Sequence, residues 1–106
     1  MPIFALFLAL ILSPYLALAQ TVAKPIADVT VTGTATLIKA KTDDRKALSC
    51  TNTSSSVHVR WGNSSVTAAS GQRLSAGSAI EIVSKGAIYM ISEGANVTVS
   101  CTEELQ

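Results

Sequence analysis

The sequence contains few of the residues from which catalytic and metal-binding sites are usually built. It has one histidine, His58, and two cysteines, Cys50 and Cys101. A structural zinc site takes about four ligands, and one histidine cannot complete such a set. The spacing around His58 does not suggest a Ser-His-Asp arrangement, and the carboxylates fall at strand edges, turns and the tail rather than as a facing pair. The sequence therefore predicts no enzymatic activity, no metal and no cofactor.

Charge is absent from the first 23 residues, which include an apolar run over residues 4–12. Pro14 then interrupts the helix, and Ala17 and Ala19 place small side chains at the two positions that signal peptidase reads. We expect a signal peptide helix over residues 1–19, cleaved between Ala19 and Gln20, and hence an exported protein that is periplasmic, secreted or virion-associated. Because the uncharged stretch is long enough to span a bilayer, an uncleaved membrane anchor is the alternative.

All 8 basic and 7 acidic residues lie in the rest of the chain, and the formal net charge is +1. This balance gives no reason to expect a nucleic acid or an anionic membrane as partner. Membrane contact is expected only through the N-terminal segment, if that segment is retained. The densest basic group is interrupted by Asp43 and Asp44 and is interpreted as a solvated hairpin end. It consists of Lys39, Lys41, Arg45 and Lys46.

The chain after residue 27 is rich in Thr, Val, Ser and Ile, with Gly, Asn and Asp at short intervals. Period-two alternation and the lack of any sustained 3.6-residue period predict an all-β fold, a small antiparallel β-sandwich of six to seven strands, with a small barrel as alternative. Gly33, on the inward parity of the first strand, is a candidate bulge or bend. The sandwich is expected over residues 28–102, after an extended lead-in at 20–27 and before a polar tail at 103–106. Strands are expected at 28–38, 45–52, 57–61, 79–83, 87–92 and 95–102, with a further short strand possible in the loop 66–71.

The two cysteines are expected to meet inside this sandwich. Alternation places Cys50 on the same inward side as Leu48, and Cys101 on the same inward side as Val97 and Val99. In an oxidising compartment a pair of cysteines predicts a disulfide. Closing a loop of roughly 50 residues stabilises a chain by about 4 kcal/mol in the chain-entropy model. Two buried free thiols are the alternative.

Three neighbouring residues, Trp61, His58 and Arg60, form a candidate ligand platform. The parity of Trp61 predicts that its ring packs in the core, whereas His58 and Arg60 are expected to point outward into solvent. An exposed Trp61 ring, together with Tyr89, would instead favour a sugar-binding platform. The inward parity of residues 87–92 stays open, because either Ile88 with Met90 or Tyr89 with Ile91 could face the core.

The loop from Asn63 to Gln72 is the favoured binding loop, because loops on a rigid scaffold commonly carry function. Three glycosylation sequons begin at Asn52, Asn63 and Asn96. They would matter only in a eukaryotic secretory pathway, and in a Ser/Thr-rich chain they are interpreted as chance occurrences.

Several segments together resemble a small β-sandwich module of structural proteins in tailed bacteriophages and prophage-derived genes. The shared elements are an Arg-Lys pair before the second strand, a glycine that ends the third, a Leu-x-x-Gly turn and an Ala-x-Tyr strand. In this chain they are Arg45-Lys46, Gly62, Leu74-Ser-Ala-Gly77 and Ala87-Ile-Tyr89. The resemblance implies a virion decoration or fibre-associated role without enzymatic activity. A signal peptide and two strand cysteines depart from that module.

The resulting hypothesis is a non-enzymatic, exported structural or adhesion module related to phage or prophage proteins. The alternative is a periplasmic or secreted binding domain for a carbohydrate or a cell-envelope protein. In both readings the partner is a protein or glycan surface, and a homo-oligomer is possible.

Overall fold

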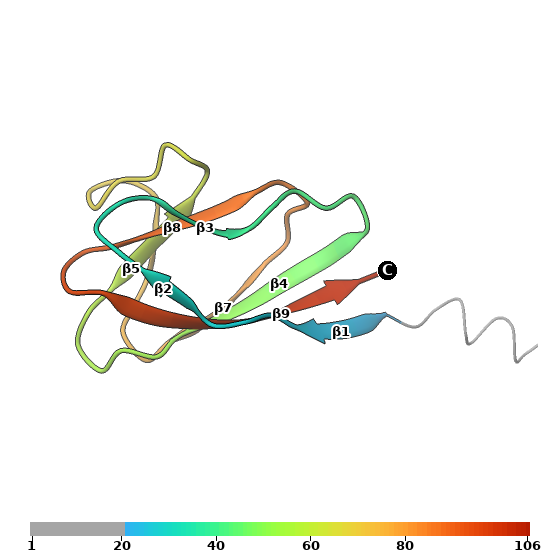
Figure 1. Cartoon of the computed structure of the whole chain (residues 1–106), viewed down its shortest axis with the longest axis horizontal. Helices are drawn as coiled ribbons and strands as arrows, with labels where there is room; N and C mark the ends of the chain where they lie inside the picture. The colour runs from blue at the N-terminus through green and yellow to red at the C-terminus, as the bar shows by residue number, and fades with distance from the viewer. Residues whose placement is uncertain (1–20) are drawn as a thin grey trace, which may run out of the picture.

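The computed structural model describes residues 21–106, which form nine β-strands in two antiparallel sheets (Figure 1). This confirms the predicted all-β antiparallel sandwich, but with nine strands instead of six or seven. No helix in the described part of the chain is long and apolar enough to cross a membrane. The predicted signal peptide helix and the cleavage site between Ala19 and Gln20 lie outside the described residues.

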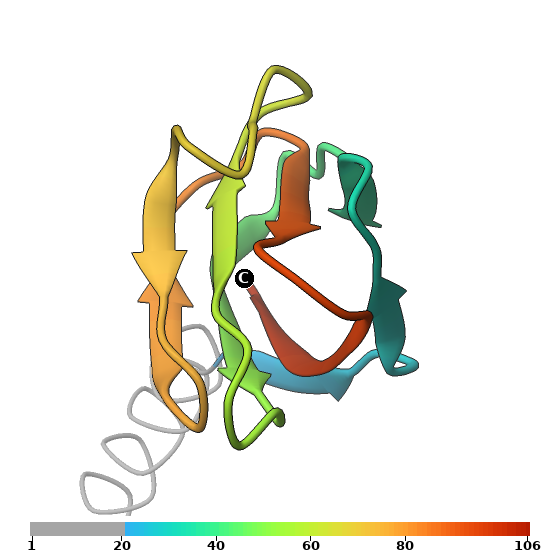
Figure 2. The same ribbon diagram turned by 90° about the vertical axis from the view of Figure 1, so that its left-hand side faces the viewer.

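The first sheet, called sheet A, has the order β1-β9-β4-β7, and β2 also pairs with β9. The second, sheet B, has the order β3-β8-β5-β6. Figure 2 looks along the domain and shows the strands of both sheets around a shared interior. Sheet A consists of β1 (Val22–Pro25), β2 (Val29–Val31), β4 (Arg45–Asn52), β7 (Ala79–Ile82) and β9 (Val97–Leu105). Sheet B consists of β3 (Thr36–Lys39), β5 (Val59–Gly62), β6 (Gln72–Leu74) and β8 (Ile88–Ser92).

Alternate side chains of the strands fill the interior, as the period-two pattern predicts. The inward sets expected for β4 and β9 are confirmed, because Leu48, Cys50, Val97, Val99 and Cys101 are all buried. In β8 the structure decides the parity that the sequence left open. Ile88 and Met90 join this core, with Val31, Ile38, Val59, Leu74 and Ile82 from the other strands.

The single first strand predicted over residues 28–38 is wrong, because the chain changes sheets in the middle of it. β2 pairs with β9 in sheet A, whereas β3 pairs with β8 in sheet B. The chain bends around Gly33, where the Thr32 hydroxyl accepts the Thr34 backbone N–H at 3.2 Å. The bend shifts the parity, so Leu37, expected inward, is 46% exposed.

Both ends of the predicted domain are also revised. Residues 22–25, expected in the lead-in, form β1 and pair with residues 102–105 of β9. The predicted polar tail is therefore largely the end of β9, and Glu103 within it is only 2% exposed. All four β1 side chains are exposed, so this pairing depends on backbone hydrogen bonds and leaves no apolar pattern in the sequence. As a result, the start of the described chain lies beside its C-terminus (Figure 1).

Candidate functional site

An ion-pair cluster lies on the outer face of sheet B. Arg60 of β5 stands directly opposite Arg73 of β6 in the strand register. Two like charges in this position destabilise an antiparallel pair. Glu93, just after β8, neutralises part of this repulsion by accepting hydrogen bonds from both side chains. The distances are 3.2 Å from Arg60 Nε, 2.8 Å from Arg73 Nε and 2.9 Å from Arg73 Nη2.

This arrangement favours the charged forms of the cluster. The hydrogen bonds from Arg73 lower the pKa of the Glu93 carboxyl below its ordinary value, and the positive charges of Arg73 and Arg60 lower it further. Desolvation of Glu93 acts in the opposite direction but is weaker than the Arg73 hydrogen bonds. The same contacts raise the pKa of Arg73. Glu93 is therefore ionised at neutral pH and serves as the shared counterion of two arginines.

Replacing Glu93 by Gln is expected to destabilise the domain at pH 7. Because the folded pKa of Glu93 lies below its unfolded value of about 4.3, its contribution is complete above that value and is lost as the pH falls through the folded pKa. The stability difference between the natural chain and Glu93→Gln should therefore shrink in acid. Urea unfolding between pH 7 and pH 3 measures it. Glu81→Gln, at an exposed β7 position without an ion pair among residues 21–106, is the matched control. An unchanged stability of Glu93→Gln at pH 7 would contradict the counterion role.

The structure does not bring the three residues of the predicted platform together. Arg60 lies on the outer face of sheet B, whereas Trp61, the next residue in β5, packs against the core and is only partly buried. The Trp61 indole Nε1 is buried and has no hydrogen-bond partner within residues 21–106. His58 is half-buried rather than freely solvated, and its Nδ1 accepts the Ala76 backbone N–H at 3.0 Å. Trp61 therefore does not supply an aromatic surface beside Arg60.

The aromatic side chain on the same face as Arg60 is that of Tyr89. It lies opposite Leu37 of β3 on one side and opposite Gly62 of β5 on the other. Ile91, two residues further along β8, lies opposite Arg60, so Tyr89 shares the outer face with Arg60. The alternation of residues 87–92 decides whether Tyr89 faces outward. The sequence alone leaves this alternation undecided, because four apolar or aromatic residues follow one another.

The predicted binding loop between β5 and β6 projects from the domain (Figures 1 and 2). Val66 is buried and anchors the loop, and Thr67 and Ser70 pair across it. Gly71 has a φ of 102°, and a Cβ there would lie 2.7 Å from Val66 Cγ2, so only glycine fits. The loop between Asn63 and Gln72 carries no charge. Its binding role stays a prediction.

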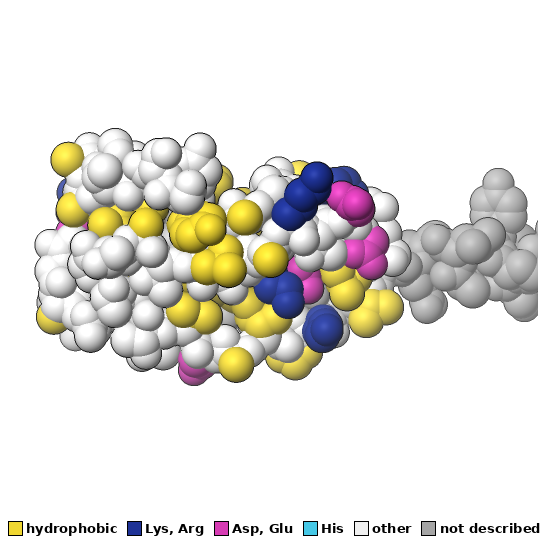
Figure 3. All heavy atoms as spheres, turned by 45° about the horizontal axis from the view of Figure 1, so that its top comes forward, with side chains coloured by type: hydrophobic (Ala, Val, Ile, Leu, Met, Phe, Trp, Pro, Cys, Tyr) yellow, Lys and Arg dark blue, Asp and Glu magenta, His cyan; other side chains and the backbone are white. Residues whose placement is uncertain are grey.

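The solvated hairpin end predicted for the basic group is wrong for Arg45, which is fully buried. Its guanidinium donates to the backbone carbonyls of Ser84 at 2.8 Å and of Ala40 at 3.2 Å, and also to that of Gly86. It lies 3.3 Å from Glu103 Oε2, itself 2% exposed. The reason is that β4 and β9 are paired neighbours in sheet A, which brings these distant charges together. Around this buried pair the surface is charged, and Figure 3 shows basic and acidic side chains gathered at this end of the domain.

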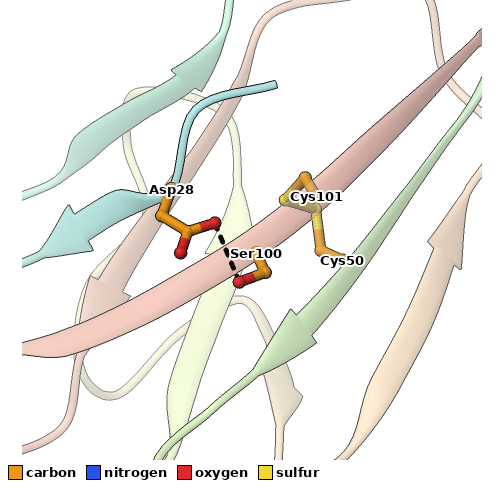
Figure 4. Close-up of a disulfide and its surroundings, with 4 residues drawn as sticks. All are labelled: Asp28, Cys50, Ser100 and Cys101. Carbon is orange, nitrogen blue, oxygen red and sulfur yellow. Dashed lines mark hydrogen bonds between the residues drawn. A yellow bond between two sulfur atoms is a disulfide. The ribbon is translucent and has the colours of Figure 1, made fainter. Parts of the chain in front are cut away.

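The predicted disulfide between Cys50 and Cys101 is present. The two residues are directly opposite each other in β4 and β9, with Cα atoms 4.1 Å apart, and both are buried. The bond therefore joins two adjacent strands within sheet A. Nearby, the Ser100 hydroxyl donates to Asp28 Oδ1 at 2.9 Å, which ties the start of β2 to β9 (Figure 4).

Two of the three sequons are accessible. Asn96 and Asn63 are exposed. Asn52, however, is fully buried, and its Nδ2 donates to the carbonyls of Val57 at 2.9 Å and Leu74 at 3.1 Å. Because that amide nitrogen already joins the β4–β5 loop to the end of β6, Asn52 is a structural residue and not an acceptor for a glycan.

Within residues 21–106 no group of three or more His, Cys, Asp or Glu side chains is placed to hold a metal ion. No family model and no curated protein sequence matches this chain. A search of solved structures finds a similar fold in a chain of Bacillus endospore appendages, which form disulfide-linked pili. The match covers 80% of this chain and 86% of that chain, with 17% sequence identity and a TM-score of 0.48. A likeness of this degree does not assign a function to the chain.

The resemblance to a tailed-bacteriophage module is wrong. The structural match is to a spore-appendage chain instead, and no family model supports the phage relationship. The turn and strand elements on which the resemblance depended are local features of antiparallel sheets, such as a glycine that ends a strand. Such elements recur in unrelated β-sandwiches because they satisfy the same backbone geometry.

Proposed function

We propose that this chain is a non-enzymatic, exported module with a structural or adhesive role. The observation that carries the proposal is the buried disulfide between Cys50 and Cys101, which joins the two central strands of sheet A. Disulfides of this kind form in oxidising compartments. The proposal includes a signal peptide at residues 1–19, removed before Gln20, on the basis of the apolar run and the small residues Ala17 and Ala19.

Any assembly of copies is proposed to be non-covalent. The chain has only two cysteines, and they are bonded to each other, so a copy that keeps this bond has no thiol for a second copy. Within residues 21–106, β7 and β6 each pair on one side only, so these sheet edges are surfaces available for self-association. Val83, just after β7, is 76% exposed and offers an apolar side chain at one edge.

Export and oxidation can be tested on one sample. The full chain, expressed in a bacterium with its own N-terminus, is expected outside the cytoplasm with a mass that lacks residues 1–19 and is two hydrogens lighter than the dithiol. On a gel without reductant it should run as a monomer, and any oligomer in native conditions should dissociate in detergent. A product that retains residues 1–19, or one with two free thiols, would contradict the proposal.

A binding role toward a glycan is the second candidate. It is favoured by one observation, the common outer face that Tyr89 shares with Arg60 and Arg73 in sheet B.

A further inference from the structure

The outer face of sheet B carries two kinds of side chain in adjacent rows. One row consists of Leu37, Tyr89 and Gly62, which are cross-strand neighbours in β3, β8 and β5. The next row includes Arg60 and Arg73. Tyr89 and Arg60 are diagonal neighbours, a separation of about 7–8 Å that long and aromatic side chains span. These five residues are called the arginine–tyrosine face.

Both arginines have donor groups that no acceptor within residues 21–106 uses. Arg60 donates through Nε to Glu93 and through Nη1 to the Gly71 carbonyl at 3.0 Å. Arg73 donates to Glu93 through Nε and Nη2. In the described chain, Arg60 Nη2 and Arg73 Nη1 make no hydrogen bond. One carboxylate thus faces two guanidinium groups, so the cluster keeps a net positive charge and free donors suited to a second carboxylate.

Next to these donors, the surface is partly apolar. Leu37 is 46% exposed and Tyr89 is half-buried. A Cβ at Gly62 would meet only Val66, at 3.7 Å, which is ordinary contact. Packing therefore does not require glycine at this position. The Val66 side chain lies over Gly62 and borders Tyr89 on the β5 side, so the apolar surface open to a sugar ring is that of Tyr89 and the exposed Leu37.

We propose that the arginine–tyrosine face binds an acidic glycan, with a sugar ring against Tyr89 and its carboxylate on Arg60 and Arg73. This inference rests on the proposed adhesive function and names its ligand class. A uronic acid polymer matches both features at once, because each sugar carries one carboxylate beside an apolar ring face. An acidic peptide matches the positive charge but has no ring surface for Tyr89.

The probe is a tetramer of galacturonic acid, titrated into the exported, disulfide-bonded protein by calorimetry in 50 mM and 500 mM salt. Arg73→Gln is expected to weaken binding by about 10-fold, because it removes charge-assisted hydrogen bonds. Tyr89→Ala is expected to weaken binding by about 5-fold at both salt concentrations, because stacking is not screened by salt. The natural chain should bind the methyl ester of the same tetramer weakly, with an affinity similar to that of Arg73→Gln for the acid. Lys46→Gln, an exposed charge removed from β4 of sheet A, is the control and should bind as the natural chain does.

Each outcome separates the alternatives. A tetramer of glutamic acid that binds as tightly as the sugar, with no effect of Tyr89→Ala, would overturn the glycan assignment in favour of an acidic peptide. No binding of either probe by a folded natural chain would overturn the inference altogether. In both cases the export, mass and gel measurements above still decide the proposed function, because they do not depend on any ligand. Melting curves of all variants identify any loss that comes from misfolding.

Discussion

Replacing Arg45 by Met is expected to lower the free energy of unfolding by about 3–5 kcal/mol, the range for breaking a buried ion pair from one side. The substitution leaves Glu103 buried without its main partner. It also leaves the carbonyls of Ala40, Ser84 and Gly86 without the donor that holds them. Lys39, 3.9 Å from Glu103 and 31% exposed, compensates only a small part of this loss. Urea unfolding at pH 7 measures the effect.

Lys46→Met provides the matched control, because Lys46 is the next residue in β4 but is exposed. Its expected change is within about 0.5 kcal/mol. Glu103→Gln is a milder second variant that keeps the shape of the side chain, and a loss of about 2 kcal/mol is expected from the weakened hydrogen bond to Arg45. If Arg45→Met unfolded at nearly the same urea concentration as Lys46→Met, the buried pair would have no part in stability.

The double variant Arg45→Met with Glu103→Leu tests whether the two charges act as a unit. Replacing both members of a buried pair by apolar residues removes the unpaired charge that each single replacement leaves. Its loss of stability is therefore expected to be smaller than the sum of the losses measured for Arg45→Met and for Glu103→Leu as single variants. A strictly additive result would mean that Arg45 stabilises the domain through the three carbonyls alone.

Removing the disulfide is expected to have a comparable effect. The bond joins residues 51 positions apart, and in the chain-entropy model a loop of this length stabilises by about 4 kcal/mol. The double variant Cys50→Ala with Cys101→Val fills the space of the two sulfur atoms without a buried polar group. It should unfold at a clearly lower urea concentration than the oxidised chain.

Reduction of the natural protein is the matched comparison for this variant. Both cysteines are buried, so a reductant should act slowly on the folded protein and quickly once urea exposes the bond. The reduced chain and the double variant are expected to agree in stability to within about 1 kcal/mol, since both lack the same loop closure. A double variant as stable as the oxidised protein would show that strand pairing alone holds β4 and β9 together.

The core was largely predictable from the sequence, and the charged features were not. Alternation identified Leu48, Val97 and Val99 as buried because a strand in a sandwich exposes every second side chain. The same rule failed for Leu37, since it assumes a straight strand and the chain bends around Gly33. The burial of Arg45 had no local signal at all, because its neighbours in sequence are charged and exposed while its partner Glu103 is 58 residues away.

The candidate binding face was only partly foreseen. The sequence placed Arg60 outward but grouped it with Trp61, whose parity in β5 points the ring toward the core. Arg73 and Glu93 are 20 residues apart in the sequence, and they become neighbours only because β5 pairs with β6 on one side and with β8 on the other.

The amino-acid order by itself determined which residues face inward in the straight strands β4 and β9, including Cys50 and Cys101. That information is local, because burial alternates along each strand whatever its partner is. The partners of β1, the change of sheet after β2, the buried position of Arg45 and the sharing of Glu93 by two arginines were decided only by the tertiary structure. These depend on register between segments far apart in the chain, and register is fixed by the packing of the whole sandwich rather than by any one segment.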